Sequence, residues 1–440
     1  MTDALAPRRA AIDILDAVIR RRQTLDVALD VPRFRVLEGR DRAFAHALAM
    51  AVLRHRGFIT AALKRRLGRP LPPEAWRTRF CLMAGIAQIL FLDVPDHAAV
   101  STSVALLDTE KRALDRRHKG LANAVLRRIA DARASLLAAL ETDPTMTLPP
   151  LFRARWRRIY GPDRTDAIAR ALACEPPLDL SPRDPADAPA LAARLGGILL
   201  PGGTIRIRSG GDIAALPGFA EGAFWVQDAA AALAARLFEG PDAREIVDLC
   251  AAPGGKTMQL AALGHDVLAI DRSDRRLALL RDSLARTGLK ARLQVADALD
   301  WRPGHPVPAI LLDAPCSATG TARRHPEVLW TRSAEDITKR AAFAARLLDH
   351  AADLLAPQGT LVFCVCSLEP EEGEQQIADF LARRRDFVRH AVTAAEIADL
   401  APALLATGDV RTTPELWPEL GGLDGFFIAR LRKHPVSGRH

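Results

Sequence analysis

Residues 245–257 read EIVDLCAAPGGKT, and this stretch decides the fold of the C-terminal half of the chain. A short apolar run ends at Leu249, and the turn after it, built on Pro253, Gly254 and Gly255, opens a helix. Glycine lets the backbone approach a ligand closely. A buried strand, a Gly-rich turn and a helix in this order indicate a ligand-binding loop at the edge of a parallel sheet.

Two common nucleotide-binding patterns do not fit this turn. The phosphate-binding pattern GxxxxGK[ST] requires a glycine five residues before Gly255, where the chain has Cys250. The dinucleotide pattern GxGxxG also fails, because Ala252 and Pro253 precede the glycine pair. We therefore expect neither a nucleoside triphosphatase nor a dinucleotide-dependent enzyme.

From residue 245 onward, short apolar strands alternate with helices. We predict helices after the first, second, fourth and fifth of six strands, at 245–249, 266–271, 291–296, 308–313, 359–366 and about 425–431. This alternation predicts a doubly wound parallel sheet of the Rossmann-like type, with ligands at the carboxyl ends of its strands.

Three successive strands of this sheet end in an acid. Asp248 closes the first, Asp271 lies 23 residues further on, and Asp297 follows the third. A carboxylate at Asp271 suits the two ribose hydroxyls of an adenosyl group, and Asp297 suits an adenine amine. Each alone could be a surface carboxylate or a helix N-cap. The three together favour an adenosyl-containing cofactor.

Two further strands carry a cysteine near the carboxyl end. VPAILLDAPCSATG runs through Asp313 to Cys316, and GTLVFCVCS runs to Cys366. A strand-end thiolate is a candidate nucleophile. Cysteine is also a small buried hydrophobe of sheet cores, which is the interpretation we prefer for Cys250 and Cys364.

Three stretches resemble, in order and spacing, the motifs of the Fmu/Sun (Nol1/Nop2/Sun) family of RNA cytosine-C5 methyltransferases: DLCAAPGGKT, LLDAPCSATGTARRHPEVLW and VFCVCSLEPEEGE. The resemblance covers roughly residues 150–432 and includes WVQDAAAALAA and LDGFFIARL. It implies a methyltransferase domain at 241–433 that uses S-adenosylmethionine, releases S-adenosylhomocysteine, and methylates carbon 5 of a cytosine in RNA.

The resemblance also implies roles for single residues. Cys366 matches the nucleophile that adds to cytosine carbon 6, Cys316 matches the cysteine that assists product release, and Asp313 matches the aspartate that contacts cofactor and cytosine. No metal site is expected. The expected cofactor residues are Cys250, Ala251, Ala252, Pro253, Gly254, Gly255, Lys256, Asp271, Arg276, Asp297 and Asp313.

The chain departs from the family pattern in three places. Val365 stands where a threonine usually precedes the nucleophile, Gly373 changes PEENE to PEEGE, and residues 181–184 read SPRD where RVN is expected. Val365 removes a hydroxyl near the thiol but not the thiol itself. The SPRD change affects how RNA would be held by the middle of the chain.

The front of the chain is basic and helical. Residues 1–140 contain 25 Lys and Arg against 14 Asp and Glu, while the remainder has 36 against 39. Apolar spacing from about residue 8 to 133 predicts an all-α bundle. RRAAIDILDAVI and DRAFAHALAMAVLRHRGFI, with FCLMAGIAQILFLDVPDHAAVSTSVALLDT and GLANAVLRRIA, resemble the NusB-like RNA-binding domain.

Basic clusters in this front domain suit RNA phosphates, although a solvated helix face explains any one of them. The clusters are Arg20/Arg21/Arg22, Lys64/Arg65/Arg66 and Arg116/Arg117/His118/Lys119. We expect the NusB-like domain at 1–140, a Pro/Thr-rich linker at 142–150 and a small α/β RNA-binding subdomain at 150–240.

The middle subdomain begins with LFRARWRRIYG, in which four arginines alternate with Phe152, Trp156 and Tyr160. This run suits phosphates and stacked bases, and helical amphipathicity alone could also produce it. Arg323, Arg324 and His325 could hold backbone phosphates or simply form a soluble loop.

The 440 residues, 49% hydrophobic, suit two or three domains. Without a signal peptide or a membrane-length apolar run, we expect a cytoplasmic monomer with reduced cysteines that binds no membrane. With the NusB-like front, the expected partner is 16S ribosomal RNA or a small-subunit assembly intermediate.

Three alternatives stay open. The substrate could be another RNA, such as tRNA or 23S ribosomal RNA. A DNA cytosine methyltransferase would use Cys316 as its nucleophile. A non-catalytic RNA-binding scaffold would not need the intact cofactor loop.

Overall fold

A computed structural model of the protein describes residues 4–110, 112–208, 211–238, 240, 244–397 and 400–435. One part of the chain, here called the helical unit, contains residues 1–174 and 322–331, and the other, the sheet unit, contains 175–321 and 332–440. No helix among the described residues is long and apolar enough to cross a lipid bilayer. The predicted domain start at residue 241 lies outside the described residues.

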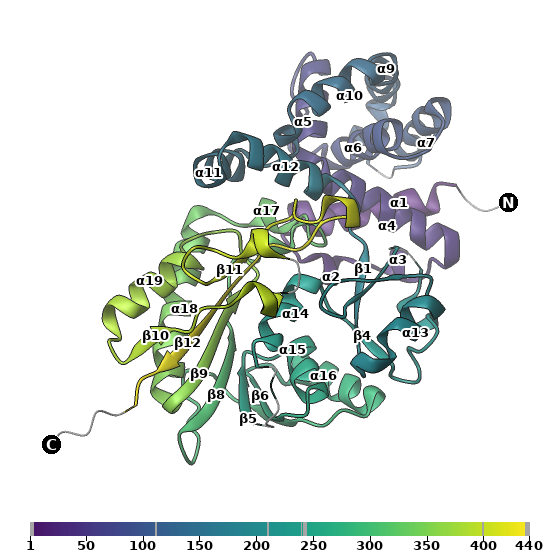
Figure 1. Cartoon of the computed structure of the whole chain (residues 1–440). Helices are drawn as coiled ribbons and strands as arrows, with labels where there is room; N and C mark the ends of the chain where they lie inside the picture. Colours follow the sequence, from purple (N-terminus) through teal and green to yellow (C-terminus); the bar gives the residue numbers. More distant parts are fainter. Residues whose placement is uncertain are drawn as a thin grey trace. The chain divides into compact units, whose positions relative to one another are not determined.

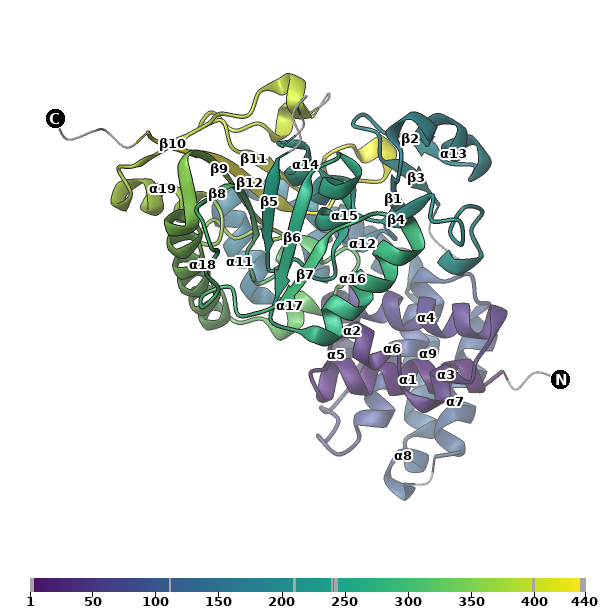
Figure 2. The ribbon, with the colours of Figure 1, turned by 90° about the horizontal axis from the view of Figure 1, so that it is seen from below.

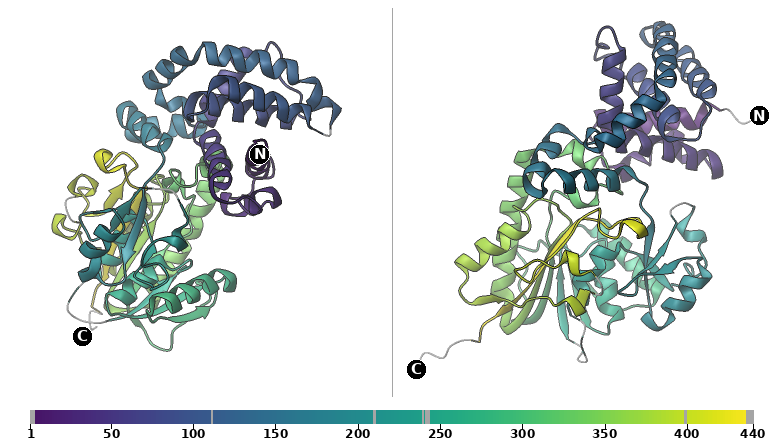
Figure 3. Two further views of the ribbon diagram at one scale, coloured as in Figure 1. Left: turned by 90° about the vertical axis from the view of Figure 1, so that its right-hand side faces the viewer. Right: turned by 45° about the horizontal axis from the view of Figure 1, so that its top comes forward.

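The helical unit confirms the predicted all-α bundle, and among its described residues the structure contains no strand (Figure 3). Helix α6 (Trp76–Phe91) lies at its centre, because every residue from Phe80 to Leu90 is buried. Its other α-helices up to residue 142 are α1 (Ala6–Leu15), α2 (Leu25–Ala28), α3 (Pro32–Arg35), α4 (Gly39–Arg54), α5 (Arg56–Arg66), α7 (Asp96–Asp108), α8 (Ala113–Arg117), α9 (Lys119–Asp131) and α10 (Arg133–Thr142), and a π-helical turn (Asp16–Arg20) directly follows α1.

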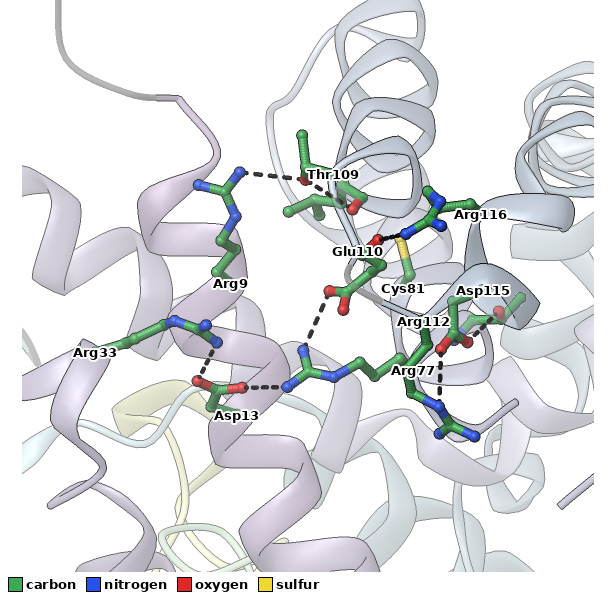
Figure 4. Close-up of polar contacts among 12 residues, drawn as sticks. Arg9, Asp13, Arg33, Arg77, Cys81, Thr109, Glu110, Arg112, Asp115 and Arg116 are labelled. Carbon is green, nitrogen blue, oxygen red and sulfur yellow. Dashed lines mark hydrogen bonds and ion pairs between the residues drawn. The ribbon is translucent and has the colours of Figure 1, made fainter. Parts of the chain in front are cut away.

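Ion pairs connect helices of this unit, as Figure 4 shows. The Arg77 guanidinium lies 3.2 Å from a Glu110 oxygen and 3.5 Å from Asp13, and Arg33 pairs with the same Asp13 at 2.8 Å. Arg9 donates to the hydroxyl of Thr109 at 3.2 Å. These arginines therefore join α1, α3, α6 and the end of α7.

Three residues of the third basic cluster also form bonds inside the helical unit. Arg116 donates to the Glu110 carbonyl oxygen at 2.7 Å, Lys119 pairs with Asp108 at 2.9 Å, and a ring nitrogen of His118 lies 3.1 Å from the Thr78 hydroxyl. The positive charge of this part of the chain is thus not wholly available to an external ligand.

Helices α11 (Pro150–Tyr160) and α12 (Pro162–Ala173) group with the helical unit, so the unit boundary lies at residue 174 rather than near 150. The Phe152 and Trp156 side chains have no exposed surface, and their ring centroids lie 5.5 Å apart. Because these rings form core, they cannot stack on bases. The amphipathic-helix explanation of this run is therefore the correct one for Phe152 and Trp156.

The sheet unit begins with a four-stranded antiparallel sheet of order β2-β3-β1-β4. Its strands are β1 (Leu178–Pro182), β2 (Ile198–Leu199), β3 (Ile205–Ile207) and β4 (Phe224–Val226), and α13 (Ala188–Arg194) packs on it (Figure 2). Arg206 of β3 and Asp179 of β1 form a buried ion pair with two contacts of 2.7 Å. Small α/β structure was predicted here and is present.

The large sheet has eight strands, in the order β10-β12-β9-β8-β5-β6-β7, with β11 paired to β12. Strands β5 to β9 run parallel, whereas β10, β11 and β12 add antiparallel pairs, so the sheet is mixed rather than wholly parallel. The six predicted strands are confirmed as β5 (Glu245–Leu249), β6 (Asp266–Asp271), β7 (Arg292–Val295), β8 (Val307–Asp313), β9 (Leu355–Val365) and β12 (Phe426–Lys433); β10 (Phe387–Arg389) and β11 (Val410–Thr412) are additional.

Helices cover both faces of the large sheet, as expected for a doubly wound fold (Figure 1). One face packs against α14 (Ala229–Arg236), α15 (Gly255–Ala262) and α16 (Asp274–Thr287). The other packs against α18 (Ala334–Leu354) and α19 (Glu374–Arg383). The carboxyl ends of β5, β6, β8 and β9 consequently lie at one edge, which is where the predicted motifs fall.

Between Thr321 and Arg332 the chain leaves the sheet unit, and residues 322–331 with α17 (Val328–Thr331) pack within the helical unit. There Glu327 accepts the Leu25 backbone N–H at 3.1 Å. Arg323 is fully buried, so its side chain cannot hold an exposed RNA phosphate and does not form a soluble loop. Both explanations of this residue are therefore wrong.

Candidate functional site

The loop after β5 is shaped by close backbone contacts. Gly254 adopts φ +105°, and a Cβ atom there would overlap the Leu280 side chain, so the position requires glycine. The Ala251 N–H donates to the Ile270 carbonyl oxygen at 3.0 Å, and the Ala252 N–H donates to Asp271 at 3.1 Å. These bonds connect the loop to the end of β6.

A cavity of about 550 Å³ opens at this edge. It brings together four of the predicted cofactor residues, namely Cys250, Asp271, Arg276 and Asp297. The sequence did not indicate the remaining lining residues, which are Arg272, Ala298, Pro315, Asp336, Lys339, Arg340, Phe343 and Leu347. Most of these come from the first part of α18, between Asp336 and Leu347, so this helix forms one wall of the cavity.

The lining groups fit an adenosyl cofactor that carries an amino acid moiety. Asp271 is held in place because each of its two oxygens accepts one backbone N–H, from Ala252 at 3.1 Å and from Ser273 at 2.9 Å. Each oxygen keeps a further lone pair that can accept a hydrogen bond from a ribose hydroxyl. Asp297 is fixed by the Leu299 N–H at 2.9 Å. Cationic residues at the rim suit a carboxylate, while Phe343 and Leu347 offer apolar surface to a purine.

The first of the three strand-end acids has another role. Asp248 is fully buried, outside the cavity lining, and accepts a hydrogen bond from Thr257 at 2.5 Å. Burial raises the pKa of this carboxyl to about 7. Asp248 therefore stabilises the start of α15, and Asp271 and Asp297 are the acids that face the cavity.

Lys256 points to Asp313, one of the predicted catalytic residues, and is absent from the cavity lining. Its ammonium nitrogen lies 2.8 Å from Asp313 and 4.8 Å from the centroid of the Phe426 ring. Burial alone would lower the pKa of Lys256, but the charge and the hydrogen bond of Asp313 raise it, and the pKa lies above its ordinary value. The lysine is thus a fixed positive charge beside Asp313.

The two predicted catalytic cysteines meet. The sulfur atoms of Cys316 and Cys366 are 3.5 Å apart, with Cys316 buried and Cys366 partly exposed just beyond the end of β9. Cys364 is fully buried and donates to Asp313 at 3.7 Å. Burial raises the pKa of the Cys250 thiol to about 12 and also raises that of Cys364.

Cys316 is a weaker acid than an ordinary thiol. Its hydrogen bond with Cys366, its burial and the negative charge of Glu372 all raise its pKa. Around the pair, the Ala314 N–H donates to the Cys364 carbonyl oxygen at 3.0 Å, and the Gly320 N–H donates to that of Cys366 at 3.1 Å. The two loops are therefore held together by backbone bonds.

Two of the departures from the family pattern lie in well-packed surroundings. Val365 is fully buried in the core between the sheet and α18 and α19. In the SPRD stretch, Ser181 donates to Gln227 at 3.0 Å, and Arg183 reaches the Thr287 carbonyl oxygen at 3.5 Å. These side chains bond within the sheet unit.

Known proteins match both halves of the chain. The family described as 16S rRNA methyltransferase RsmB/F matches residues 235–432, and the NusB family matches residues 5–131. The ribosomal RNA small subunit methyltransferase B of Klebsiella pneumoniae is 34% identical over 97% of this chain and 98% of its own length. The protein of the same name from Pseudomonas syringae is 34% identical over 98% of each chain.

The chain belongs to the ribosomal RNA small subunit methyltransferase B family. This family uses S-adenosylmethionine as methyl donor, which confirms the predicted cofactor. The crystal structure of PH0851 shares the fold, with a TM-score of 0.75, 22% identity and coverage of 98% of this chain and 100% of that one. A methyltransferase homolog from Pyrococcus horikoshii has a TM-score of 0.54 at 25% identity, over 67% of this chain and 98% of its own.

Proposed function

We propose that the protein transfers a methyl group from S-adenosylmethionine to carbon 5 of a cytosine in 16S ribosomal RNA. The names of its relatives support the small-subunit RNA as substrate. The observation that carries the cytosine chemistry is the pair of thiols 3.5 Å apart at the carboxyl ends of β8 and β9. Pro315, which precedes one of these thiols, lines the cofactor cavity.

In this proposal Cys366 is the nucleophile. Carbon 5 of cytosine is too electron-poor to attack a methyl donor, and a thiolate that bonds to carbon 6 makes carbon 5 an enamine carbon. Cys366 is the partly exposed member of the pair and follows the last residue of β9, so a base can reach its sulfur. Cys316 is buried and less accessible.

Asp313 is proposed to hold the cytosine. Lys256 at 2.8 Å and the Cys364 thiol at 3.7 Å fix its two oxygens, and the side chain remains about a third exposed. A fixed, accessible carboxylate can accept a hydrogen bond from the amine of the base or from protonated N3. It would thereby place carbon 6 next to Cys366.

The donor is proposed to bind in the cavity, with Asp271 holding the ribose hydroxyls and Asp297 the adenine amine. Its sulfonium group supplies an electrophilic methyl group. After methyl transfer a base takes the proton from carbon 5, and the electron pair of that C–H bond forms the double bond between carbons 5 and 6. The bond from sulfur to carbon 6 breaks at the same time, and its electron pair returns to Cys366. The Cys316 thiol lies 3.5 Å from the Cys366 sulfur and is proposed to assist release by donating a hydrogen bond to that sulfur as it departs.

Trapping with a modified RNA tests the covalent step. Small-subunit RNA that contains 5-fluorocytosine cannot lose a proton from carbon 5, so an adduct resistant to denaturants should accumulate on the wild-type protein with the donor. Cys366→Ala should form none, and Cys316→Ala should form adduct even on unmodified RNA. Cys174→Ala, which removes an exposed cysteine of the helical unit, is the matched control and should behave like wild type.

Two outcomes would contradict this proposal. Adduct on Cys316 but not on Cys366 would assign the nucleophile to the other thiol. Bisulfite sequencing of RNA from a deletion strain that shows the lost 5-methylcytosine in tRNA or 23S ribosomal RNA, with 16S ribosomal RNA unchanged, would assign another substrate.

A further inference from the structure

A buried carboxylate that the proposed chemistry does not use lies behind the thiol pair. Glu372 has no exposed surface, and both of its oxygens accept hydrogen bonds from Ser317, one from the backbone N–H at 2.8 Å and one from the hydroxyl at 2.5 Å. Burial raises the pKa of Glu372, and its hydrogen bonds with Ser317 and Ser367 oppose that rise because they stabilise the ionised carboxylate. Burying such a charge is costly, so its position calls for an explanation.

Glu372 joins the residues that directly follow the two thiols. Ser317 follows Cys316, and its hydroxyl lies 3.2 Å from that of Ser367, which follows Cys366. From the other side, Arg332 donates to the Ser317 carbonyl oxygen at 3.1 Å. One carboxylate thus fixes the backbone on which the distance of 3.5 Å between the sulfur atoms depends.

The charges around the pair are unequal. Glu372 disfavours a negative charge on Cys316, and its effect adds to those of the Cys366 hydrogen bond and of burial. Lys256 interacts favourably with a negative charge on Cys366. Arg332 interacts favourably with a negative charge on Cys316 and on Glu372, while its own burial and the charge of Arg340 lower the pKa of Arg332.

We propose that Glu372 is a positioning residue that keeps the shared proton of the thiol pair on Cys316, so that Cys366 is the thiolate. The inference rests on the proposed function, which makes Cys366 the nucleophile. The Cys316 S–H then points to the Cys366 sulfur until that sulfur bonds to carbon 6. When the bond to carbon 6 breaks, the electron pair returns to Cys366 and the same hydrogen bond forms again.

Site-resolved alkylation of the full chain tests this assignment without RNA or methyl transfer. Iodoacetamide is applied over a range of pH, and the modification rate of each cysteine is followed by mass spectrometry. In the wild type the rate for Cys316 should reach half its maximum at a higher pH than that for Cys366. Equal or reversed midpoints would overturn the inference, and this measurement needs no variant that could fail to fold.

The charge itself is tested by Glu372→Gln, which keeps the size of the side chain and an acceptor for the Ser317 N–H. The Cys316 midpoint should fall by roughly one pH unit, which is about a tenfold faster rate at a fixed lower pH. Glu372→Asp keeps the charge, and Glu371→Gln removes a charge one residue away, at a partly exposed position. Both should retain the wild-type midpoint.

Two results would reject the role of Glu372. One is an unchanged Cys316 midpoint in a folded Glu372→Gln protein that still binds S-adenosylmethionine in calorimetry. The other is an equal shift in Glu372→Asp, which would indicate loosened packing rather than lost charge. Trapping on 5-fluorocytosine RNA identifies the nucleophile independently. The assignment of Cys366 as nucleophile and the role of Glu372 can therefore fail separately.

Discussion

The two units of the chain use charged side chains in different ways. In the helical unit, Arg33 and Arg77 share Asp13 at partly exposed positions and hold helices together. In the sheet unit, Arg206 and Asp179 are paired with at most 3% of either side chain exposed. Exposed pairs contribute little to stability because water screens them, whereas a buried charge that loses its partner is costly. Loss of one arginine should therefore reduce stability much more in the sheet unit than in the helical unit.

The largest effect should follow from breaking the buried pair of the sheet unit. Arg206 also donates to the carbonyl oxygens of Leu420 and Gly422, both at 2.9 Å, so Arg206→Met leaves Asp179 and two carbonyl groups without these donors. We expect the free energy of unfolding of the sheet unit to fall by about 3–5 kcal/mol. Urea unfolding with pulse proteolysis, which assigns fragments to each unit, measures the loss.

The double variant Arg206→Met with Asp179→Leu is the control. Removing both charges should restore part of the stability, and the recovery stays partial because Asp179 also accepts the Ala229 N–H at 3.0 Å. A loss of less than about 1 kcal/mol in the single variant would show that the pair is no more important than an exposed one.

The two units should also respond to pH in opposite directions. Asp248 of the sheet unit has a pKa of about 7 against an ordinary 3.8, so its stabilising effect is complete below 3.8 and is lost as the pH rises through 7. Burial and the nearby Arg54 lower the pKa of His55 in the helical unit to about 4 from 6.5. The contribution of neutral His55 to the stability of the helical unit is complete above pH 6.5 and is lost as the pH falls through 4.

Lowering the pH from 7.5 to 5 should therefore add the Asp248 contribution to the stability of the sheet unit and remove the His55 contribution from that of the helical unit, each on the order of 1–3 kcal/mol. Pulse proteolysis in urea at both pH values follows the units separately. Asp248→Asn should abolish the gain, and His55→Phe should abolish the loss while keeping a ring stacked on Phe91, whose centroid lies 3.7 Å away. Parallel changes in both units would contradict the assignment.

This contrast also explains what could be predicted from sequence. The strand-end residues lie in short local motifs, so the sequence could indicate the cysteine pair and the acids Asp271 and Asp297, which the structure places at one edge of the sheet; their roles stay predictions. A turn of fixed backbone shape requires particular residues at particular spacings, as Gly254 against Leu280 shows. The family comparison then confirmed the cofactor.

Residues that act through tertiary packing were not predictable. The α18 wall of the cavity depends on which face of a helix meets the sheet edge, and Glu372 is one of several acids in LEPEEGE until the fold places it beside Ser317. The helical unit has no motif of fixed spacing. Its arginines predicted a positive charge, but not that Arg116 bonds to Glu110 or that Phe152 and Trp156 are core.

The smallest effect should come from breaking an exposed ion pair of the helical unit. Arg33 is about half exposed and pairs with Asp13 at 2.8 Å, but Asp13 keeps Arg77 as a second partner at 3.5 Å. Arg33→Ala should therefore lower the free energy of unfolding of the helical unit by less than about 1 kcal/mol, and less at high salt. Unfolding in urea at low and high ionic strength measures this. A loss as large as that of Arg206→Met, and insensitive to salt, would contradict this expectation. It would mean that the ion pairs in Figure 4 stabilise the helical unit as strongly as the buried pair stabilises the sheet unit.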